Sequence, residues 1–329
     1  MSENEAQRPG AHPRPAPEIH PQPPGPSAAG PKRSELTARL FTASFLVPAI
    51  VFIIVQGGLW VLGSIIVLTL LGLREFYGLI EEKGAHPLVG FGLVAGAALP
   101  VVAYVGNEYH ATLLMTAVLL CVMVVQLTKA EITEAMASIS GTFFGIFYVG
   151  WLLSHAVVLR GFYRAAVAKW PAVRDLGLAP DVGVFVGFFA VATVALCDAG
   201  AYFAGRAYGV HKLAPRISPG KSIEGAMGGI LTGMAGGLAT KGVFDFFWPQ
   251  LSRILSWKAA LLFSFTVAVV AIIGDLVESL LKRDAKRKDA GALLPGVGGV
   301  LDRIDSSLLG IPVMYYMLLG YLYLQVGAP

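Results

Sequence analysis

Long apolar stretches dominate this chain, and their lengths suit helices that cross a membrane. A helix needs about 20 mostly apolar residues to span the hydrocarbon core of a bilayer. Segments of this kind, separated by short polar connections, lie at 38–56, 58–80, 88–106, 110–128, 138–160, 182–206, 223–241, 258–281 and 307–326. The pattern predicts an all-α, polytopic integral membrane protein with about nine transmembrane helices.

The composition agrees with a membrane protein, except at the N-terminus. Only 14% of the residues are charged and 55% are hydrophobic, whereas a soluble domain has about 25% charged residues. Residues 1–34 are instead rich in Pro, Gly, Ser and Ala. Such a stretch cannot bury enough apolar surface to offset its ordering entropy. We therefore predict a disordered cytoplasmic tail over 1–34, and not a signal peptide, because the first apolar run starts too late.

Basic residues in the connections predict the orientation, because cytoplasmic connections are enriched in Lys and Arg. Lys32, Arg33 and Arg39 stand at the start of the first apolar segment and favour a cytoplasmic N-terminus. With nine spans, the cytoplasmic connections are then 74–87, 129–137, 207–222 and 282–306, of which the last two are the most basic. One connection does not fit this rule: residues 160–181 carry Arg160, Arg164, Lys169 and Arg174 on the opposite side.

The eighth apolar segment ends in a charged helical face. Asp275, Glu278, Ser279 and Lys282 follow the spacing i, i+3, i+4 and i+7, so they share one side of a helix. A carboxylate at this depth in a membrane is costly, and it is expected to face a protein cavity and to pair with a cation. The alternative is structural, with Glu278 and Lys282 forming an i,i+4 ion pair at the membrane surface.

The connection after this helix is dense in charge of both signs. Residues 282–307 hold six basic and four acidic side chains. A basic anchor for anionic lipid would explain Lys286, Arg287 and Lys288, but not the interleaved Asp289 and the later Asp302 and Asp305. Carboxylates bind Mg²⁺, cations neutralise phosphate oxygens, and glycines let backbone N–H groups approach a ligand. The mixture is typical of a metal–phosphate site.

A second polar cluster lies one connection earlier. Asp198 lies in an apolar segment, and the basic connection that follows leads into "SPGKSIEG" at the start of the seventh segment. Ser218 or Ser222 could cap that helix, with Glu224 in its first turn. The "GKS" is not a Walker A motif, because the upstream glycine spacing and a preceding strand are both missing. Gly225, Gly229, Gly233 and Gly237 then recur every four residues, which favours close helix packing in lipid.

These motifs together resemble a known signature. The run from Ser279 to Asp305 is similar to that of the phosphatidate cytidylyltransferases, also called CDP-diacylglycerol synthases. The matching positions are Ser279, Lys282, Arg283, Lys288, Asp289, Gly298, Gly299, Asp302, Arg303 and Asp305. Gly274, Asp275 and the stretch around Asp198 and "ISPGKSIEG" extend the resemblance over about 194–310. The family usually has His before the Gly–Gly pair, where this chain has Val297, and Gly220 and Ser222 stand where Lys and Thr are common.

The resemblance implies a reaction and a set of roles. The reaction joins CTP and phosphatidate to give CDP-diacylglycerol and pyrophosphate, with Mg²⁺ as cofactor. The catalytic residues would be Asp275, Lys282, Arg283, Lys288, Asp289, Asp302 and Arg303. Substrates would contact Asp198, Ser218, Lys221, Ser222, Glu224, Gly298 and Gly299, and the metal ligands would come from Asp275, Asp302, Asp289 and Asp305.

The resemblance also sets expectations for the whole chain. Residues 35–180 would form N-terminal transmembrane helices and 181–329 the transmembrane catalytic region. The expected protein is a homodimer in the inner or plasma membrane, with its active site facing the cytoplasm, membrane lipid around it and no nucleic acid partner. The alternatives are a CTP-dependent lipid kinase acting on a polyprenol or phytol, an ion-coupled transporter with Asp198 and Asp275 as ion ligands, and an inactive homologue.

Overall fold

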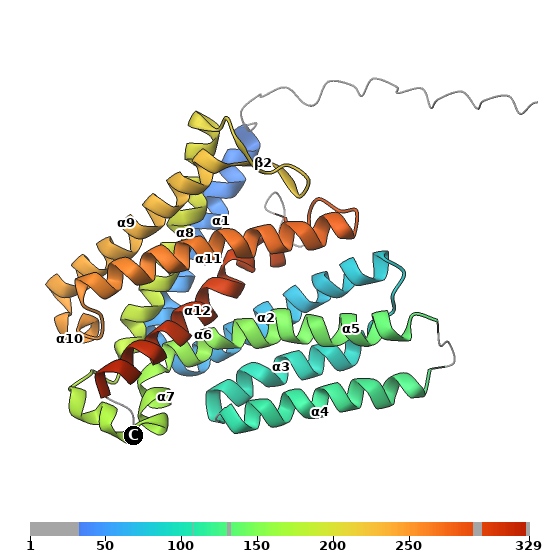
Figure 1. The fold of residues 1–329 in the computed structure, drawn as a ribbon, viewed down its shortest axis with the longest axis horizontal. Helices are drawn as coiled ribbons and strands as arrows, with labels where there is room; N and C mark the ends of the chain where they lie inside the picture. The colour runs from blue at the N-terminus through green and yellow to red at the C-terminus, as the bar shows by residue number, and fades with distance from the viewer. Residues whose placement is uncertain (1–32, 107, 130–132, 292–297, 327–329) are drawn as a thin grey trace, which may run out of the picture.

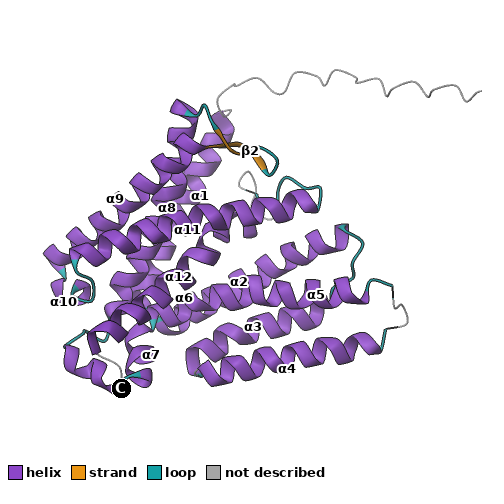
Figure 2. Ribbon diagram, viewed as in Figure 1, coloured by secondary structure: helices purple, strands orange, loops and turns teal. Residues whose placement is uncertain are grey.

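The fold was obtained as a computed structural model, which describes residues 33–106, 108–129, 133–291 and 298–326. Within these ranges the chain is almost entirely helical (Figures 1 and 2). All nine apolar segments predicted from the sequence are helical. In chain order they are α1 (Arg33–Gln56), α2 (Gly58–Glu82), α3 (Val89–Val105), α4 (Glu108–Leu127), the continuous run α5 (Ala135–Gly145), η1 (Ile146–Trp151) and α6 (Leu152–Arg160), α8 (Val182–Tyr208), α9 (Ile223–Phe247), α11 (Trp257–Asp284) and α12 (Leu301–Val326).

Six of these segments, among the described residues, are long and apolar enough to cross a membrane. They are Gly58–Glu82, Tyr109–Leu127, Ala135–Arg160, Val182–Tyr208, Trp257–Asp284 and Leu301–Val326. The described apolar part of α1 and helix α3 are shorter, and α9 does not reach the same apolarity. The chain is therefore a multi-pass membrane protein, and the predicted count of nine spans is not confirmed.

Smaller elements connect the long helices. The basic connection after α6 folds into α7 (Phe162–Lys169) and the 3₁₀ helix η2 (Pro171–Leu176), and α10 (Pro249–Ser252) precedes α11. Between α8 and α9 lies a β-hairpin of β1 (Lys212–Ala214) and β2 (Ser218–Ser222), which pair antiparallel. The sequence reasoning did not predict this hairpin. The predicted tail 1–34 lies outside the described residues, except that α1 already begins at Arg33.

Helices α8 and α9 pack closely along most of their length, and the glycine stripe of α9 explains this contact. A Cβ atom on Gly225, Gly229 or Gly233 would lie only 2.8–2.9 Å from a backbone oxygen of α8. Any larger residue would push the two backbones apart. The stripe is thus a helix-packing surface, as the spacing of four predicted.

Helices α11 and α12 join the two parts of the molecule. Helices α2 to α6 lie on one side, and α8 and α9 on the other (Figure 1). One core cluster contains Phe189 of α8, Val267 of α11 and Met314 of α12. A second cluster contains Phe76 of α2, Val149 of η1 and Leu301 of α12. The first turns of α12 and the last turns of α11 thus pack in the second cluster, while the rest of both helices packs in the first.

Candidate active site

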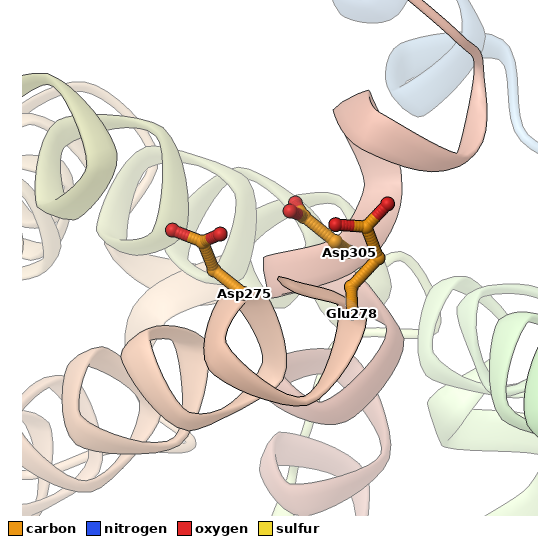
Figure 3. A group of neighbouring side chains, drawn as sticks. All are labelled: Asp275, Glu278 and Asp305. Atoms are coloured by element: carbon orange, nitrogen blue, oxygen red, sulfur yellow. The ribbon is translucent and has the colours of Figure 1, made fainter. Parts of the chain in front are cut away.

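Three carboxylates meet where α11 crosses α12. Asp275 and Glu278 come from α11 and Asp305 from α12, and one oxygen of each lies within 4.8 Å of the others. Figure 3 shows that the three carboxylates point to the same side of the crossing. Glu278 is fully buried and Asp305 is 8% exposed. Like charges so close and so poorly hydrated repel one another unless cations compensate them.

The close approach of the two helices depends on Gly274. A Cβ at this position would lie 2.7 Å from the backbone oxygen of Asp305. Only glycine lets α11 come so near α12, which places Asp275 and Glu278 opposite Asp305. The "GD" pair noted in the sequence therefore has a direct structural reason.

Two lysines contact this acidic group. The Nζ atom of Lys221 lies 2.7 Å from Oδ1 of Asp275, and that of Lys282 lies 2.5 Å from Oε2 of Glu278. Lys221 belongs to strand β2, so the hairpin delivers a cation from a distant part of the chain. The i,i+4 pair of Glu278 and Lys282 was the structural alternative for Glu278. The pair exists, but Glu278 also belongs to the acidic group.

Asp302 binds one lysine and two backbone N–H groups. Its Oδ1 accepts a hydrogen bond from Lys282 at 2.6 Å, and its Oδ2 accepts from the backbone N–H of Gly299 at 2.8 Å and of Ala290 at 3.1 Å. Asp302 thus links the start of α12 to the end of α11, through Lys282, and to Ala290 and Gly299 in the connection between the two helices. It lies outside the group of three carboxylates, and so does the exposed Asp289. Their predicted role as metal ligands remains untested.

Glu75 of α2 was missed by the sequence reasoning. Its carboxylate accepts hydrogen bonds from the backbone N–H groups of Val300 at 3.0 Å and Leu301 at 2.8 Å, at the start of α12. An anion there is favourable because the first N–H groups of a helix lack partners within the helix. The same carboxylate fills the space that a Cβ of Gly291 or Gly299 would need. A signal did exist, because Glu75 is an acid inside a predicted apolar segment.

Ser306 was also missed, and it links two acids. Its hydroxyl donates to Oδ1 of Asp198 at 2.9 Å, while its backbone N–H donates to Oδ1 of Asp305 at 2.7 Å. Ser306 is 2% exposed. Asp198, predicted as a further polar position, therefore lies at the edge of the acidic group. No sequence pattern distinguishes this serine from Ser307 beside it.

The hairpin and the start of α9 hold the other predicted substrate contacts. Ser222 caps α9, since its hydroxyl accepts from the N–H of Gly225 at 3.1 Å; Ser218 begins β2 and is not the cap. Glu224 binds the ring of His211, whose Nδ1 lies 2.6 Å from Oε1, and accepts from the backbone N–H of Val210 at 3.1 Å. Glu224 thus closes the hairpin onto α9 in this structure.

The remaining predicted residues lie outside the acidic group of Asp275, Glu278 and Asp305. Arg283 donates to the backbone oxygen of Ile217 at 3.2 Å, which ties α11 to the hairpin. Lys288 and Arg303 are exposed. Gly298 has φ +94° beside Asp302, a conformation that favours glycine. Val297 lies outside the described residues.

Known proteins resemble this chain over most of its length. A family model described as the cytidylyltransferase family matches residues 37–321. The phosphatidate cytidylyltransferase of Synechocystis is 30% identical over 291 residues, which are 85% of this chain and 95% of that protein. The one of Pseudomonas aeruginosa is 35% identical over 292 residues, or 86% and 97%. The one of Bacillus subtilis is 43% identical over 131 residues, or 40% and 46%. The chain therefore belongs to the cytidylyltransferase family.

Proposed function

We propose that this protein transfers the cytidylyl group of CTP to phosphatidate, giving CDP-diacylglycerol and pyrophosphate. A phosphate oxygen of phosphatidate forms a bond to the α-phosphorus of CTP, and the bond from that phosphorus to the β-phosphate oxygen breaks. One observation supports this proposal best. A buried acidic group with two lysines lies at one end of a bundle of apolar helices. A lipid phosphate and a water-soluble nucleotide can both reach such a position.

The nucleophile needs no strong base. A phosphate monoester is largely dianionic at neutral pH, because its second pKa is about 6. The difficulty is instead electrostatic, since two anionic substrates must meet. The protein must therefore position both phosphates and supply positive charge to the oxygens that gain negative charge as the bonds change.

The acidic group suits a divalent cation. Asp275, Glu278 and Asp305 offer hard oxygen ligands from two helices, and Mg²⁺ prefers oxygen ligands. We propose these three residues as its ligands, in place of the broader set suggested by the sequence. When bound, the ion would neutralise phosphate charge. The backbone N–H of Ser306 binds the carboxylate of Asp305, and its hydroxyl connects this position to Asp198.

The basic residues have the complementary task. Lys221 and Lys282 border the acidic group, and we propose that they bind phosphate oxygens of the two substrates. Asp302 orients Lys282 and also fastens the connection that precedes α12. Asp302 is therefore assigned a positioning role, and Glu75 fixes the same helix end through the backbone N–H groups of Val300 and Leu301.

The cellular setting belongs to the same proposal. The two most basic connections are 207–222 and 282–306. Their described residues lie at the end of the helices that carries the acidic group, which favours a cytoplasmic site. We propose a homodimer in the inner or plasma membrane, with Mg²⁺ as cofactor and CTP and phosphatidate as substrates.

The test is the identity of the products. Purified full-length protein in detergent receives CTP, MgCl₂ and phosphatidate, and CDP-diacylglycerol and pyrophosphate are followed by mass spectrometry. We expect equal amounts of both, and a loss of about 100-fold or more in Asp275→Asn. The matched control is Asp181→Asn, which alters an exposed acid at the other end of the bundle. Formation of CDP would instead indicate a lipid kinase. Absence of both CDP-diacylglycerol and pyrophosphate would contradict the proposal.

A further inference from the structure

We propose a second ligand site, for an anionic phospholipid, in a cavity between α3, α4, α6, α7 and α12. The cavity has a volume of about 610 Å³, within the range of about 300–1,000 Å³ that is usual for ligand sites. The proposal does not depend on the reaction assigned above, because none of the residues of the acidic group lines this cavity.

The cavity lies near the opposite end of the helices from the acidic group. On α12, Tyr316 lines the cavity and follows Asp305 by 11 residues, a separation of about 16 Å along a helix. The other walls come from the end of α3, the start of α4 and the connection from α6 to α7. In Figure 1, α7 lies at the lower left of the molecule, far from the hairpin that delivers Lys221. A phosphate in this cavity cannot reach the reaction site.

The floor of the cavity is aromatic with one polar pair. His155 is 5% exposed, and its Nδ1 donates to the backbone oxygen of Trp151 at 2.9 Å. Because that nitrogen carries the proton, a neutral His155 accepts the hydroxyl of Tyr316 at its Nε2, 3.1 Å away. Trp151 and Tyr315 complete this floor. Such a surface suits the glycerol region and the upper acyl chain of a lipid.

The rim of the cavity is basic. Arg164 and Lys169 line it and are exposed, and none of the described lining residues is acidic. The guanidinium of Arg164 lies 5.4 Å from the centre of the Tyr104 ring. This contact uses the face of the ring and holds the group at the wall without using its N–H donors. A planar guanidinium held in this way suits a phosphate oxygen pair.

This site gives a reason for the basic connection that does not fit the positive-inside pattern. Arg160 has structural partners, since it donates to the backbone oxygens of Ile54 at 2.6 Å and Val55 at 3.1 Å. Arg164 lines the cavity with its guanidinium over the Tyr104 ring, and Lys169, whose Nζ lies 5.5 Å from the centre of the Trp170 ring, lines it as well. An anionic headgroup would be attracted by the positive charge at this membrane surface, whereas a zwitterionic lipid would bring its own cation.

The test is photolabelling in nanodiscs. Full-length protein is reconstituted in phosphatidylcholine with a small fraction of phosphatidylglycerol that carries a photoreactive acyl chain, and the labelled peptides are mapped by mass spectrometry. We expect labels within 99–111 and 151–169. Arg164→Gln combined with Lys169→Gln should lower this labelling about tenfold, while the control Arg174→Gln, in η2 and outside the cavity lining, should not.

A cavity-filling variant and a competition experiment complete the test. Ala165→Trp fills the cavity but keeps both cations, and it should also abolish the labelling. Unlabelled phosphatidylglycerol should compete, while phosphatidylcholine and glycerol 1-phosphate should not. Equal labelling in the double variant, or by a phosphatidylcholine probe, would overturn the proposal. Competition by glycerol 1-phosphate would show a site for free phosphate and not for a lipid.

Discussion

Replacement of Glu75 should lower the rate of the reaction, although Glu75 is not part of the acidic group. Its carboxylate accepts two backbone hydrogen bonds at the start of α12, from Val300 and Leu301. A hydrogen bond to a charged group contributes about 1.5–3 kcal/mol, and a buried donor left unsatisfied costs about 1–3 kcal/mol. Glu75→Ala should thus destabilise this helix end by about 3–5 kcal/mol. Glu75→Gln, which keeps one carbonyl oxygen, should cost roughly half as much.

The effect should reach the reaction because the first turns of α12 carry Asp302 and Asp305. We expect the kcat of Glu75→Ala to fall about 100-fold, with Glu75→Gln in between, since 2.7 kcal/mol corresponds to about that factor. The assay measures CDP-diacylglycerol formation together with the unfolding temperature in detergent. The control is Glu81→Ala, an exposed acid on the same helix.

A double variant tests the contact between Glu75 and Gly291. A Cβ on Gly291 would overlap the Glu75 side chain, because its three nearest atoms all belong to Glu75. Gly291→Ala should therefore damage the native protein but cost little more in the Glu75→Ala background. Activity within threefold of wild type in Glu75→Ala, or simple additivity of the two changes, would refute this reasoning.

Three further changes have distinct expected results. Lys282→Gln leaves Glu278 and Asp302 without their shared cation and should destabilise the protein by about 3–5 kcal/mol, measured as a lower unfolding temperature, whereas Lys83→Gln at an exposed pair should change it little. Gly233→Ala places a Cβ 2.9 Å from the Thr193 oxygen and should cost about 1–3 kcal/mol; Gly220→Ala, with open space around it, should be neutral in the same melting assay. Ser306→Ala removes the hydroxyl that binds Asp198 and should lower the kcat. A kcat unchanged from wild type would contradict the proposed role of Ser306 as a link between Asp198 and Asp305.

Local spacing predicted the parts of the structure that depend on one helix. Apolar runs of helical length gave the long helices, and the i, i+3, i+7 spacing placed Asp275, Glu278 and Lys282 on one face. The four-residue glycine repeat predicted that α9 packs closely against another helix, and the structure shows that this helix is α8. Each of these features is set by residues close together in the chain, so the sequence carries the signal directly.

Contacts between distant residues could not be predicted in the same way. Glu75 binds backbone groups more than 200 positions later, and Lys221 reaches Asp275 only because a short hairpin forms. The hydrogen-bond partners of Asp302 could not be predicted for a related reason. Its side chain is fixed by Lys282 and by the backbone of a connection whose path no periodic pattern describes.

The most direct test of the proposed reaction follows the two ends of the triphosphate. Full-length protein receives phosphatidate, MgCl₂ and CTP labelled with ³²P at either the α- or the γ-phosphate, beside Asp305→Asn as the inactive comparison. We expect the α-label in the lipid product and the γ-label in pyrophosphate, with neither transferred by the variant. A γ-label in the lipid would show that the protein is a kinase, and would contradict the transfer of a cytidylyl group at the acidic group of α11 and α12.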